Sequence, residues 1–135
     1  MPEDEPRLEE IGDAECRRLL GGHNVGRIGV VVDGWPVVLP VNYVFDGHRV
    51  AIRSDPGSKL TASDLGRVAF EIDGIDEGGR RGWSVLVQGR GFDITESLDE
   101  VSELMRALPV DPWAPGQKAH WIRIDPERVT GRRLR

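Results

Sequence analysis

The chain has 135 residues, of which 39% are hydrophobic and 30% are charged, and its formal net charge at pH 7 is -5. This length and composition are typical of one globular domain, because a second core would leave each half of the chain too small. Proteins that bind nucleic acid through general electrostatics normally carry a basic excess, so the acidic balance argues against a nucleic-acid partner.

The N-terminal end of the chain is expected to differ from the rest. Residues 1–10 are rich in proline and acidic side chains, which predicts a flexible segment ahead of a single domain over residues 11–135. This segment lacks the features of a signal or transit peptide, and no apolar run of the chain approaches the length needed to cross a membrane. Cys16 is the only cysteine, so an intrachain disulfide is excluded. These features predict a cytoplasmic protein without a membrane partner.

A short helix is the first regular element that the pattern predicts. Asp13 is of a residue type that caps helices, and the glycine pair at 21–22 provides a stop. Three apolar residues fall at helical spacing between them: Cys16, Leu19 and Leu20. We expect these side chains to face the core, and the cysteine to serve as inert packing.

Three strands are predicted next. Residues 25–32 are rich in β-branched side chains and end at the Asp-Gly pair 33–34, which is a strong hairpin signal. Residues 36–45 form the partner strand, and a second Asp-Gly pair at 46–47 leads into a third strand over 48–54. Because the connections are so short, we expect the three strands to form an antiparallel meander.

Two further strands follow in the second half of the chain. Apolar and polar residues alternate along 67–73, as expected for a half-buried strand. A loop rich in glycine and charge is expected over 74–82, followed by a strand over 83–92. Gly89 and Gly91 remove side chains late in this strand, which favours a bulge or a barrel corner.

A second helix and a last strand complete the pattern. Residues 97–100 match a capping box, and apolar residues then recur at helical spacing until Pro109 ends the helix. Residues 120–125 form the last strand, which Pro126 is expected to limit. Six strands and two short helices, with turns too short for parallel crossovers, predict a mainly β antiparallel barrel.

Residues 53–63 combine a strand end and a glycine turn with groups that bind anions. Arg53 offers a planar fork of donors and Lys59 a point charge, while Ser54 and Ser58 add hydroxyl groups. A phosphate would satisfy all of them. The same spacing also fits a solvated turn with surface charges, and the glycine and lysine spacing of a P-loop is missing.

Five stretches in a fixed order carry a resemblance to a known family. They are VGRIG at 25–29, PVVLPVNY at 36–43, IRS at 52–54 with GSKL at 57–60, VAFEID at 68–73, and GWSVLVQG at 82–89. Together they resemble the pyridoxamine 5'-phosphate oxidase-like FMN-binding split-barrel family over about residues 11–135. The resemblance implies a six-stranded antiparallel split β-barrel that holds FMN at the interface of a homodimer.

The resemblance also implies which residues would hold the FMN. One strand would lie along the isoalloxazine ring, and the glycine turn would hold the phosphate. The implied residues are Pro40, Val41, Asn42 and Tyr43 beside the ring, Arg53, Ser54, Ser58, Lys59 and Leu60 at the phosphate, Trp83, Ser84 and Val85 from the neighbouring strand or subunit, and Trp121 from the partner chain. Two of them have a plain structural alternative, in which Asn42 satisfies backbone groups at a bend and Trp83 anchors the core.

A flavin performs the redox chemistry itself, so no catalytic dyad is required and the catalytic residues stay unassigned. The resemblance implies an FMN-dependent oxidoreductase that acts on an unidentified small molecule. Three alternatives share the fold: a flavin carrier or sensor without turnover, a deazaflavin-dependent reductase, and a haem-binding protein. The deazaflavin's acidic tail would use Arg80, Arg81 and Arg90, whereas haem would require a suitably placed histidine. The scattered histidines predict no metal site.

The C-terminal end distinguishes this chain from the oxidases that give the family its name. Those enzymes carry an arginine and a histidine there, which bind the phosphate of the substrate. This chain has Arg132 and Arg133 but no histidine after His120. We therefore expect no oxidation of pyridoxamine 5'-phosphate, because the clamp that orients the substrate is missing.

Overall fold

The computed structural model describes residues 5–55, 60 and 64–135. In this part of the chain it has seven strands and two helices, in the order β1 (Leu8–Ile11), α1 (Asp13–Gly21), β2 (Val25–Val32), β3 (Trp35–Phe45), β4 (Val50–Ser54), β5 (Asp64–Asp76), β6 (Arg81–Asp93), α2 (Glu100–Arg106) and β7 (His120–Leu134). The predicted mainly β class, with antiparallel pairing and two short helices, is confirmed. The strand count is seven rather than the predicted six.

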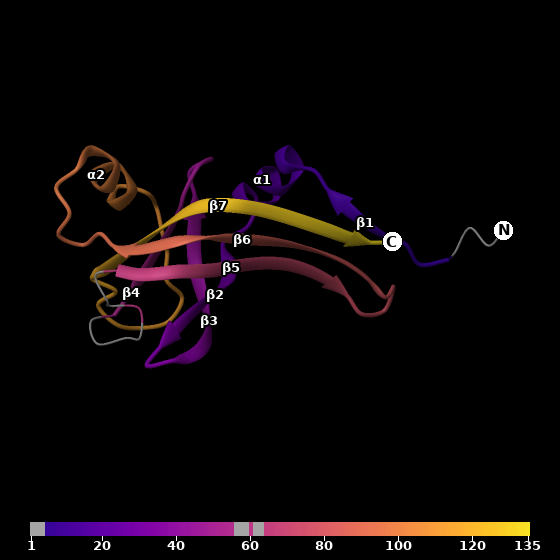
Figure 1. Ribbon diagram of the computed structural model, residues 1–135, viewed down its shortest axis with the longest axis horizontal. Coiled ribbons are helices and arrows are strands. Elements are labelled where there is room, and N and C mark those ends of the chain that lie inside the picture. Colours follow the sequence, from indigo (N-terminus) through magenta and orange to yellow (C-terminus); the bar gives the residue numbers. More distant parts are fainter. Residues whose placement is uncertain (1–4, 56–59, 61–63) are drawn as a thin grey trace.

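Six of these strands close into a ring. Their order is β7-β4-β3-β2-β5-β6, and β6 pairs back with β7. The inner side of the ring carries the main core, which includes Ile28, Tyr43, Ile52, Phe70, Val85, Val87, Ile122 and Ile124. Figure 1 shows β5, β6 and β7 side by side along the longest axis, extending well beyond the ring toward the C-terminus. One end of the molecule is therefore a barrel and the other is an open sheet.

The additional strand, β1, lies partly within the segment that was expected to be flexible. Leu8 pairs with Leu134 and Ile11 pairs with Gly131, so the predicted boundary between residues 10 and 11 falls inside a strand. The sequence of β1 has little apolar character. Its structure depends on pairing with the far end of β7, which periodicity within the segment does not reveal.

The last strand is longer than predicted, because Pro126 does not end it. Gln88 pairs with Arg128 whereas Gly89 pairs with Pro126, so β7 has one extra residue at a bulge. Proline lacks a backbone N–H and is tolerated at such an irregularity. A side chain at Gly89 would collide with the backbone carbonyl of Asp125. The predicted irregularity at Gly89 is confirmed, and the close approach of the two backbones is the reason for glycine.

The segment 74–82, expected to be a loop, is mostly strand. β5 and β6 continue into it as a hairpin, and residues 77–80 form its turn. A side chain at Gly74 would collide with the indole of Trp83. The glycine that suggested a loop instead makes room for a tryptophan on the neighbouring strand.

Helix α1 is present as predicted, but its cap is different. Gly12 is the N-cap, and Asp13 is the first helical residue. The Asp13 carboxylate accepts a hydrogen bond from Nε of Arg17, one turn later, at 2.9 Å. The side chains predicted to face the core are indeed buried: Cys16, Leu19 and Leu20.

Helix α2 begins later than the predicted capping box. Asp99, rather than Ser97, is the N-cap, because its Oδ1 accepts from the Ser102 backbone N–H at 2.9 Å and its Oδ2 accepts from the Ser102 hydroxyl at 2.7 Å. Neither helix of the described chain is long and apolar enough to cross a membrane.

A second, smaller core joins α2 to the outside of β4. Met105 packs in a buried cluster with Ala51, Ile94 and Val110. Ala51 belongs to β4, where inward-facing and outward-facing side chains alternate. This packing places the segment after α2 beside the end of β4, where Arg53 lies.

Strand β3 pairs with different neighbours along its two parts. Residues 35–42 pair with β2, whereas residues 43–45 pair with β4. Within the described residues, the stretch 35–42 therefore has one free edge. Apolar side chains are exposed on this hairpin: Val31, Trp35 and Val38, at 62%, 74% and 69%.

Replacement of Gly89 by alanine tests the bulge. Gly89→Ala is expected to lower the free energy of unfolding by about 1–3 kcal/mol, because the new methyl group meets backbone that has no room to move. Gly29→Ala in β2 is the matched control, since its Cβ would lie 3.6 Å from that of Ala69, an ordinary contact. Urea unfolding followed by tryptophan fluorescence measures both. Equal effects of the two substitutions would contradict the tight approach at Gly89.

Candidate functional site

Arg53 lies where the end of β4 meets the start of β7. It pairs across the strands with Trp121, and its guanidinium carbon lies 5.3 Å from the centre of the indole ring. Its Nε donates to the carbonyl oxygen of Lys118 at 3.1 Å, and a terminal nitrogen donates to that of Val110 at 3.4 Å. These contacts hold the guanidinium group in place and leave N–H donors for an anion.

Ser54 follows Arg53 on the opposite side of β4. The residue is 7% exposed, and its buried hydroxyl has no hydrogen-bond partner among the described residues. Such a group costs roughly 1–3 kcal/mol when it stays unpaired, so it is suited to binding a ligand. The other two predicted phosphate ligands, Ser58 and Lys59, lie outside the described residues.

His120 opposes Ser54 across the two strands, and an acidic side chain holds it. Its Nδ1 lies 2.8 Å from Oδ2 of Asp93, whose Oδ1 accepts from the backbone N–H and the hydroxyl of Thr95 at 3.0 and 2.5 Å. Burial alone would raise the pKa of Asp93, but these hydrogen bonds lower it. No group of three or more potential metal ligands occurs in the described parts of the chain. Sequence reasoning missed the contact between His120 and Asp93, because 27 residues separate them.

An ion pair attaches the segment before β7 to the end of β4. Nζ of Lys118 lies 2.7 Å from Oδ2 of Asp55, and the backbone N–H of Lys118 donates to Oδ1 at 2.8 Å. Both bonds lower the pKa of the Asp55 carboxyl. The carbonyl of Lys118 also accepts from Arg53, so the ion pair and the guanidinium group support each other.

Asn42 binds other parts of the chain through its side chain. Its Oδ1 accepts from the backbone N–H of Trp113 at 2.8 Å, and its Nδ2 donates to the carbonyl of Asn24 at 3.3 Å. The amide therefore satisfies backbone groups, as the structural alternative for this residue stated. Pro40 precedes it by two positions and lies on the same side of β3.

Four other predicted residues turn their side chains into the core: Val41, Tyr43, Leu60 and Val85. The Tyr43 hydroxyl donates to the carbonyl of Leu20 at 2.6 Å, and burial raises its pKa. These side chains fill the ring. Any contact between these residues and a ligand outside the ring would have to come from their main chain.

Trp83 and Ser84 lie far from Arg53 in the same chain. Trp83 pairs with Arg133 near the end of β7, whereas Arg53 pairs with Trp121 at its beginning. A strand rises about 3.3 Å per residue, so roughly 35 Å or more of β7 separates the two positions. They would line one ligand only if a second copy of the chain brought them together.

Trp83 itself has the features of a core anchor. Its ring centroid lies 4.9 Å from that of His23, and its indole occupies the space beside Gly74. It also packs against the main hydrophobic core. Within one chain, Trp83 therefore anchors the core, as the structural alternative to a flavin contact predicted.

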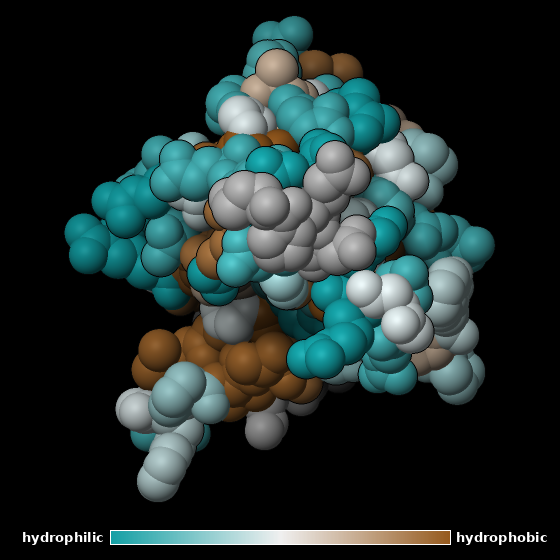
Figure 2. Space-filling view, turned by 90° about the vertical axis from the view of Figure 1, so that its right-hand side faces the viewer, coloured by the Kyte–Doolittle hydropathy of each residue, from teal (hydrophilic) through white to brown (hydrophobic). Residues whose placement is uncertain are grey.

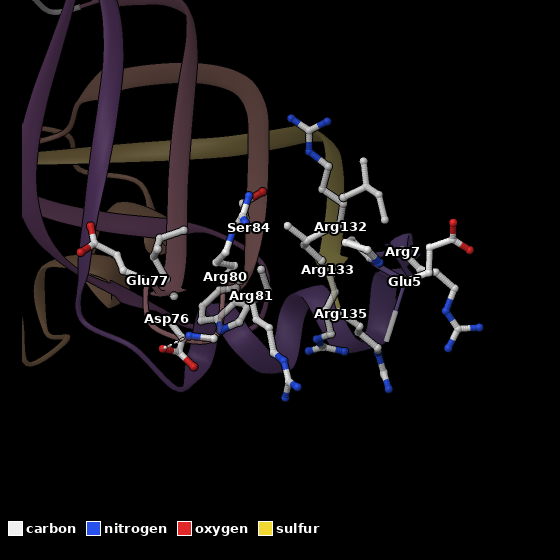
Figure 3. A pocket seen from close by; sticks show the side chains of 18 residues that line it. Glu5, Arg7, Asp76, Glu77, Arg80, Arg81, Ser84, Arg132, Arg133 and Arg135 are labelled. Atoms are coloured by element: carbon white, nitrogen blue, oxygen red, sulfur yellow. Dashed lines mark hydrogen bonds between the residues drawn. The ribbon is translucent and has the colours of Figure 1, made fainter. Parts of the chain in front are cut away.

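A hollow of about 1560 Å³ lies at this end of the long strands, and Trp83 and Ser84 line part of it (Figure 3). The turn between β5 and β6, the end of β7 and the segment before β1 supply its walls. Its arginines are Arg7, Arg80, Arg81, Arg132, Arg133 and Arg135. Arg90, which the sequence grouped with two of them, pairs with Asp125 toward the other end of β6. The hollow was missed because its walls come from strands longer than predicted.

Three charged side chains form a cluster on the outer side of β2 and β5. A terminal nitrogen of Arg27 lies 3.6 Å from carboxylate oxygens of both Glu71 and Asp73. Burial, and then hydrogen bonding and repulsion from Asp73, raise the pKa of Glu71 to about 7, although Arg27 opposes this shift. Glu71 therefore gains or loses its proton near neutral pH.

The closed ring with its extended strands is the split-barrel fold seen in solved structures. A structure described as a putative pyridoxamine 5'-phosphate oxidase from Corynebacterium glutamicum has a TM-score of 0.72 and 26% identity, and the match covers 94% of this chain and 93% of that chain. The FAD binding protein from Mycobacterium smegmatis has a TM-score of 0.69 and 29% identity, over 96% of this chain and 100% of that one. An FAD-binding protein from Mesorhizobium loti has a TM-score of 0.70 and 27% identity, over 93% and 97%. The fold thus defines a protein of the split-barrel class.

Sequence comparison gives the family. The model of the pyridoxamine 5'-phosphate oxidase family matches residues 12–133. An uncharacterized protein of Mycobacterium tuberculosis is 30% identical over 139 residues, which cover 98% of this chain and 90% of that protein. The chain belongs to the pyridoxamine 5'-phosphate oxidase family, and the resemblance seen in its sequence is confirmed.

The raised pKa of Glu71 predicts a pH-dependent stability. The folded chain holds this proton more tightly than the unfolded chain, so the contribution of Glu71 is fully present below the ordinary value of 4.5 and is lost as the pH rises through about 7. Glu71→Gln should therefore raise the melting temperature relative to wild type more at pH 8 than at pH 5. Glu77→Gln, in the exposed turn, is the control. An equal difference in melting temperature between Glu71→Gln and wild type at both pH values would contradict the raised pKa of Glu71.

Proposed function

We propose that this chain binds a flavin at the end of β4, with the flavin phosphate held by Arg53 and Ser54, and that it is an oxidoreductase acting on a small molecule. The observation that carries the proposal is the fixed guanidinium group of Arg53, which has donors to spare and is followed in β4 by the buried Ser54 hydroxyl without a partner. An arginine fork and a hydroxyl are groups that recognise phosphate. Lys59 and Ser58 would complete the phosphate site according to the sequence.

Comparisons with relatives support a flavin as the ligand. Two structures that are 29% and 27% identical to this chain, and that match nearly all of it, are described as FAD-binding proteins. We propose FMN rather than FAD for this chain, because the phosphate site ends the ligand at a monophosphate. The chain also lacks the Gly-x-Gly-x-x-Gly motif that precedes a helix in many dinucleotide-binding proteins.

The chemistry would come from the bound flavin, which transfers electrons. The protein would supply binding and orientation. Arg53 would hold the phosphate while Trp121 and the carbonyls of Lys118 and Val110 hold Arg53. His120 would lie beside the same strand end, oriented by Asp93. The site is thus built on paired strands, which fix its geometry better than a loop would.

We further propose that the protein acts as a homodimer with the flavin between the two chains. Trp83 and Ser84 lie too far from Arg53 in one chain to share its ligand, so a second copy would have to supply them. The β2–β3 hairpin offers an apolar contact surface through Val31 and Val38. Figure 2 shows a hydrophobic patch at the bottom of the face, at the level where this hairpin lies in Figure 1.

Flavin titration tests the phosphate site. Arg53→Ala is expected to raise the dissociation constant for FMN by roughly ten- to a hundredfold, the loss typical of a charge-assisted hydrogen bond. Ser54→Ala should weaken FMN binding while leaving the flavin-free protein as stable as before or more stable, because it removes an unpaired buried hydroxyl. Arg67→Ala, at an exposed position of β5, is the control.

Two outcomes of this titration would change the proposal. Unchanged FMN affinity in both Arg53→Ala and Ser54→Ala would contradict the phosphate site at the end of β4. Tighter binding of FAD than of FMN by the wild-type chain would contradict the choice of FMN while leaving flavin binding intact.

Disruption of the apolar hairpin tests the dimer. Val38→Asp is expected to halve the mass measured by light scattering and to weaken FMN binding, because a charge would be buried at the interface. Leu98→Asp is the control, since Leu98 is 86% exposed beside α2 and away from the hairpin. A monomeric Val38→Asp variant that binds FMN as well as wild type would contradict a site shared between chains.

A further inference from the structure

Three arginines of the hollow lie on one side of the long strands. Trp83 pairs with Arg133, and the same register continued by one residue beyond the Gly82–Leu134 pair brings Arg81 beside Arg135. Figure 3 shows Arg81, Arg133 and Arg135 on one side of the strands and Arg132 on the other. We call the residues Arg81, Arg133 and Arg135 the arginine row.

Acidic partners neutralise two of the three arginines in the row and leave Arg81 unpaired within the described residues. Arg133 lies 3.6 Å from Glu15, and Arg135 lies 3.1 Å from Glu9. The remaining guanidinium groups of the hollow form no ion pair or side-chain hydrogen bond within the described residues: Arg7, Arg80, Arg81 and Arg132. Like charges on neighbouring strands destabilise a sheet, and an anion bound between them would remove this repulsion.

Three carboxylates line the hollow, Glu5, Asp76 and Glu77, against six arginines, so they offset only part of its positive charge. Asp76 uses its Oδ1 to accept a hydrogen bond from the backbone N–H of Gly79 at 3.1 Å, so it supports the turn. Glu77 is exposed on the turn itself. A concave surface that carries mainly one sign of charge attracts ligands of the opposite sign, even in a protein with a net charge of -5.

The backbone around the row is held by hydrogen bonds. The N–H of Arg7 donates to the carbonyl of Arg135, and the N–H of Arg135 donates to that of Arg7, both at 2.9 Å. Paired strands therefore fix the backbone positions from which the side chains of the arginine row extend. The half-buried Trp83 lines the same hollow beside Arg133, and the part of its indole that is not packed against the core would contact a base.

We propose that the arginine row, with Arg80 and Trp83, binds a nucleoside diphosphate group. The adjacent phosphates would bind the guanidinium groups, and the base would lie against the tryptophan. The group could belong to a free nucleotide or to the nucleotide half of a dinucleotide. Within one chain the site lies roughly 35 Å or more along β7 from Arg53. In the proposed homodimer it would adjoin the flavin of the partner subunit, because Trp83 belongs to both.

The turn residue Arg80 offers a sharp variant. Its φ is +53°, in the left-handed region that favours glycine. Arg80→Gly therefore removes a charge from the hollow and relieves the backbone at the same time. Its melting temperature should stay unchanged or rise while its affinity for the nucleotide falls, and a merely structural role for Arg80 would not give this combination.

Calorimetry of the full chain with ADP, in the presence of saturating FMN, tests the proposal. ADP is expected to bind and to raise the melting temperature, while adenosine is expected to bind far more weakly. Arg80→Gly and Arg81→Ala should each weaken ADP binding by roughly tenfold or more. Arg132→Ala is the matched control, because Arg132 is also unpaired but lies on the other side of the strands. Titration with NADH in place of ADP separates a dinucleotide from a free nucleotide.

Several results would overturn the nucleotide site. They are the absence of ADP binding, equal affinity for ADP and adenosine, unchanged ADP affinity in both Arg80→Gly and Arg81→Ala, and loss of ADP binding in Arg53→Ala, which would place ADP in the flavin site. Binding of RNA or of anionic phosphatidylglycerol vesicles, but not of ADP, would also overturn it. None of these results bears on FMN binding, which the titration at Arg53 and Ser54 measures separately.

Discussion

The pairing of β6 with β7 is the interaction on which the rest of this structure depends. It runs from Gly82 opposite Leu134 to Asp93 opposite Ile122, and it closes the ring at one end while extending the sheet at the other. Continuous pairing over this length requires the bulge at Gly89, where Asp125 approaches too closely for any side chain. The proposed flavin site, on β4 beside the start of β7, and the arginine row lie at opposite ends of this pairing.

The two proposed sites would bind anions by different means. At the barrel end, a single arginine is held by backbone carbonyls and an indole, and the buried hydroxyl of the next residue in β4 remains unpaired. Recognition there depends on a few fixed donors in a partly desolvated place, where each hydrogen bond matters most. At the sheet end, several exposed arginines act together, and screening by salt would weaken them more. Ionic strength should therefore affect the two sites unequally.

Local patterns predicted the elements that depend on local signals. The strand 25–32 has the predicted bounds, the buried face of α1 is the predicted one, and the irregularity at Gly89 is present. The family resemblance also predicted the barrel. Features that depend on pairing between distant segments were missed, including β1, the extension of β7 past Pro126, and the contact of His120 with Asp93.

For the candidate site, too, the sequence predicted local features but not contacts between distant segments. The sequence predicted that Arg53 and Ser54 bind an anion, which stays a prediction, and the structure shows their surroundings at the end of β4. The family resemblance grouped Tyr43 and Val85 with the ligand, and their side chains fill the core. A contact with the flavin would therefore come from their main chain, as the resemblance implies for residues 40–43.

The partly unpaired edge of β3 has a consequence for how copies of this protein meet. A free strand edge is a template on which other chains can add strands and aggregate. Along residues 35–42 the strand contains Pro36 and Pro40, neither of which has a backbone N–H to donate. This edge is therefore poorly suited to strand addition, and association through the exposed valines of the hairpin would be directed to the face of the sheet. The two prolines thus protect the chain against edge-to-edge aggregation while leaving its apolar surface available.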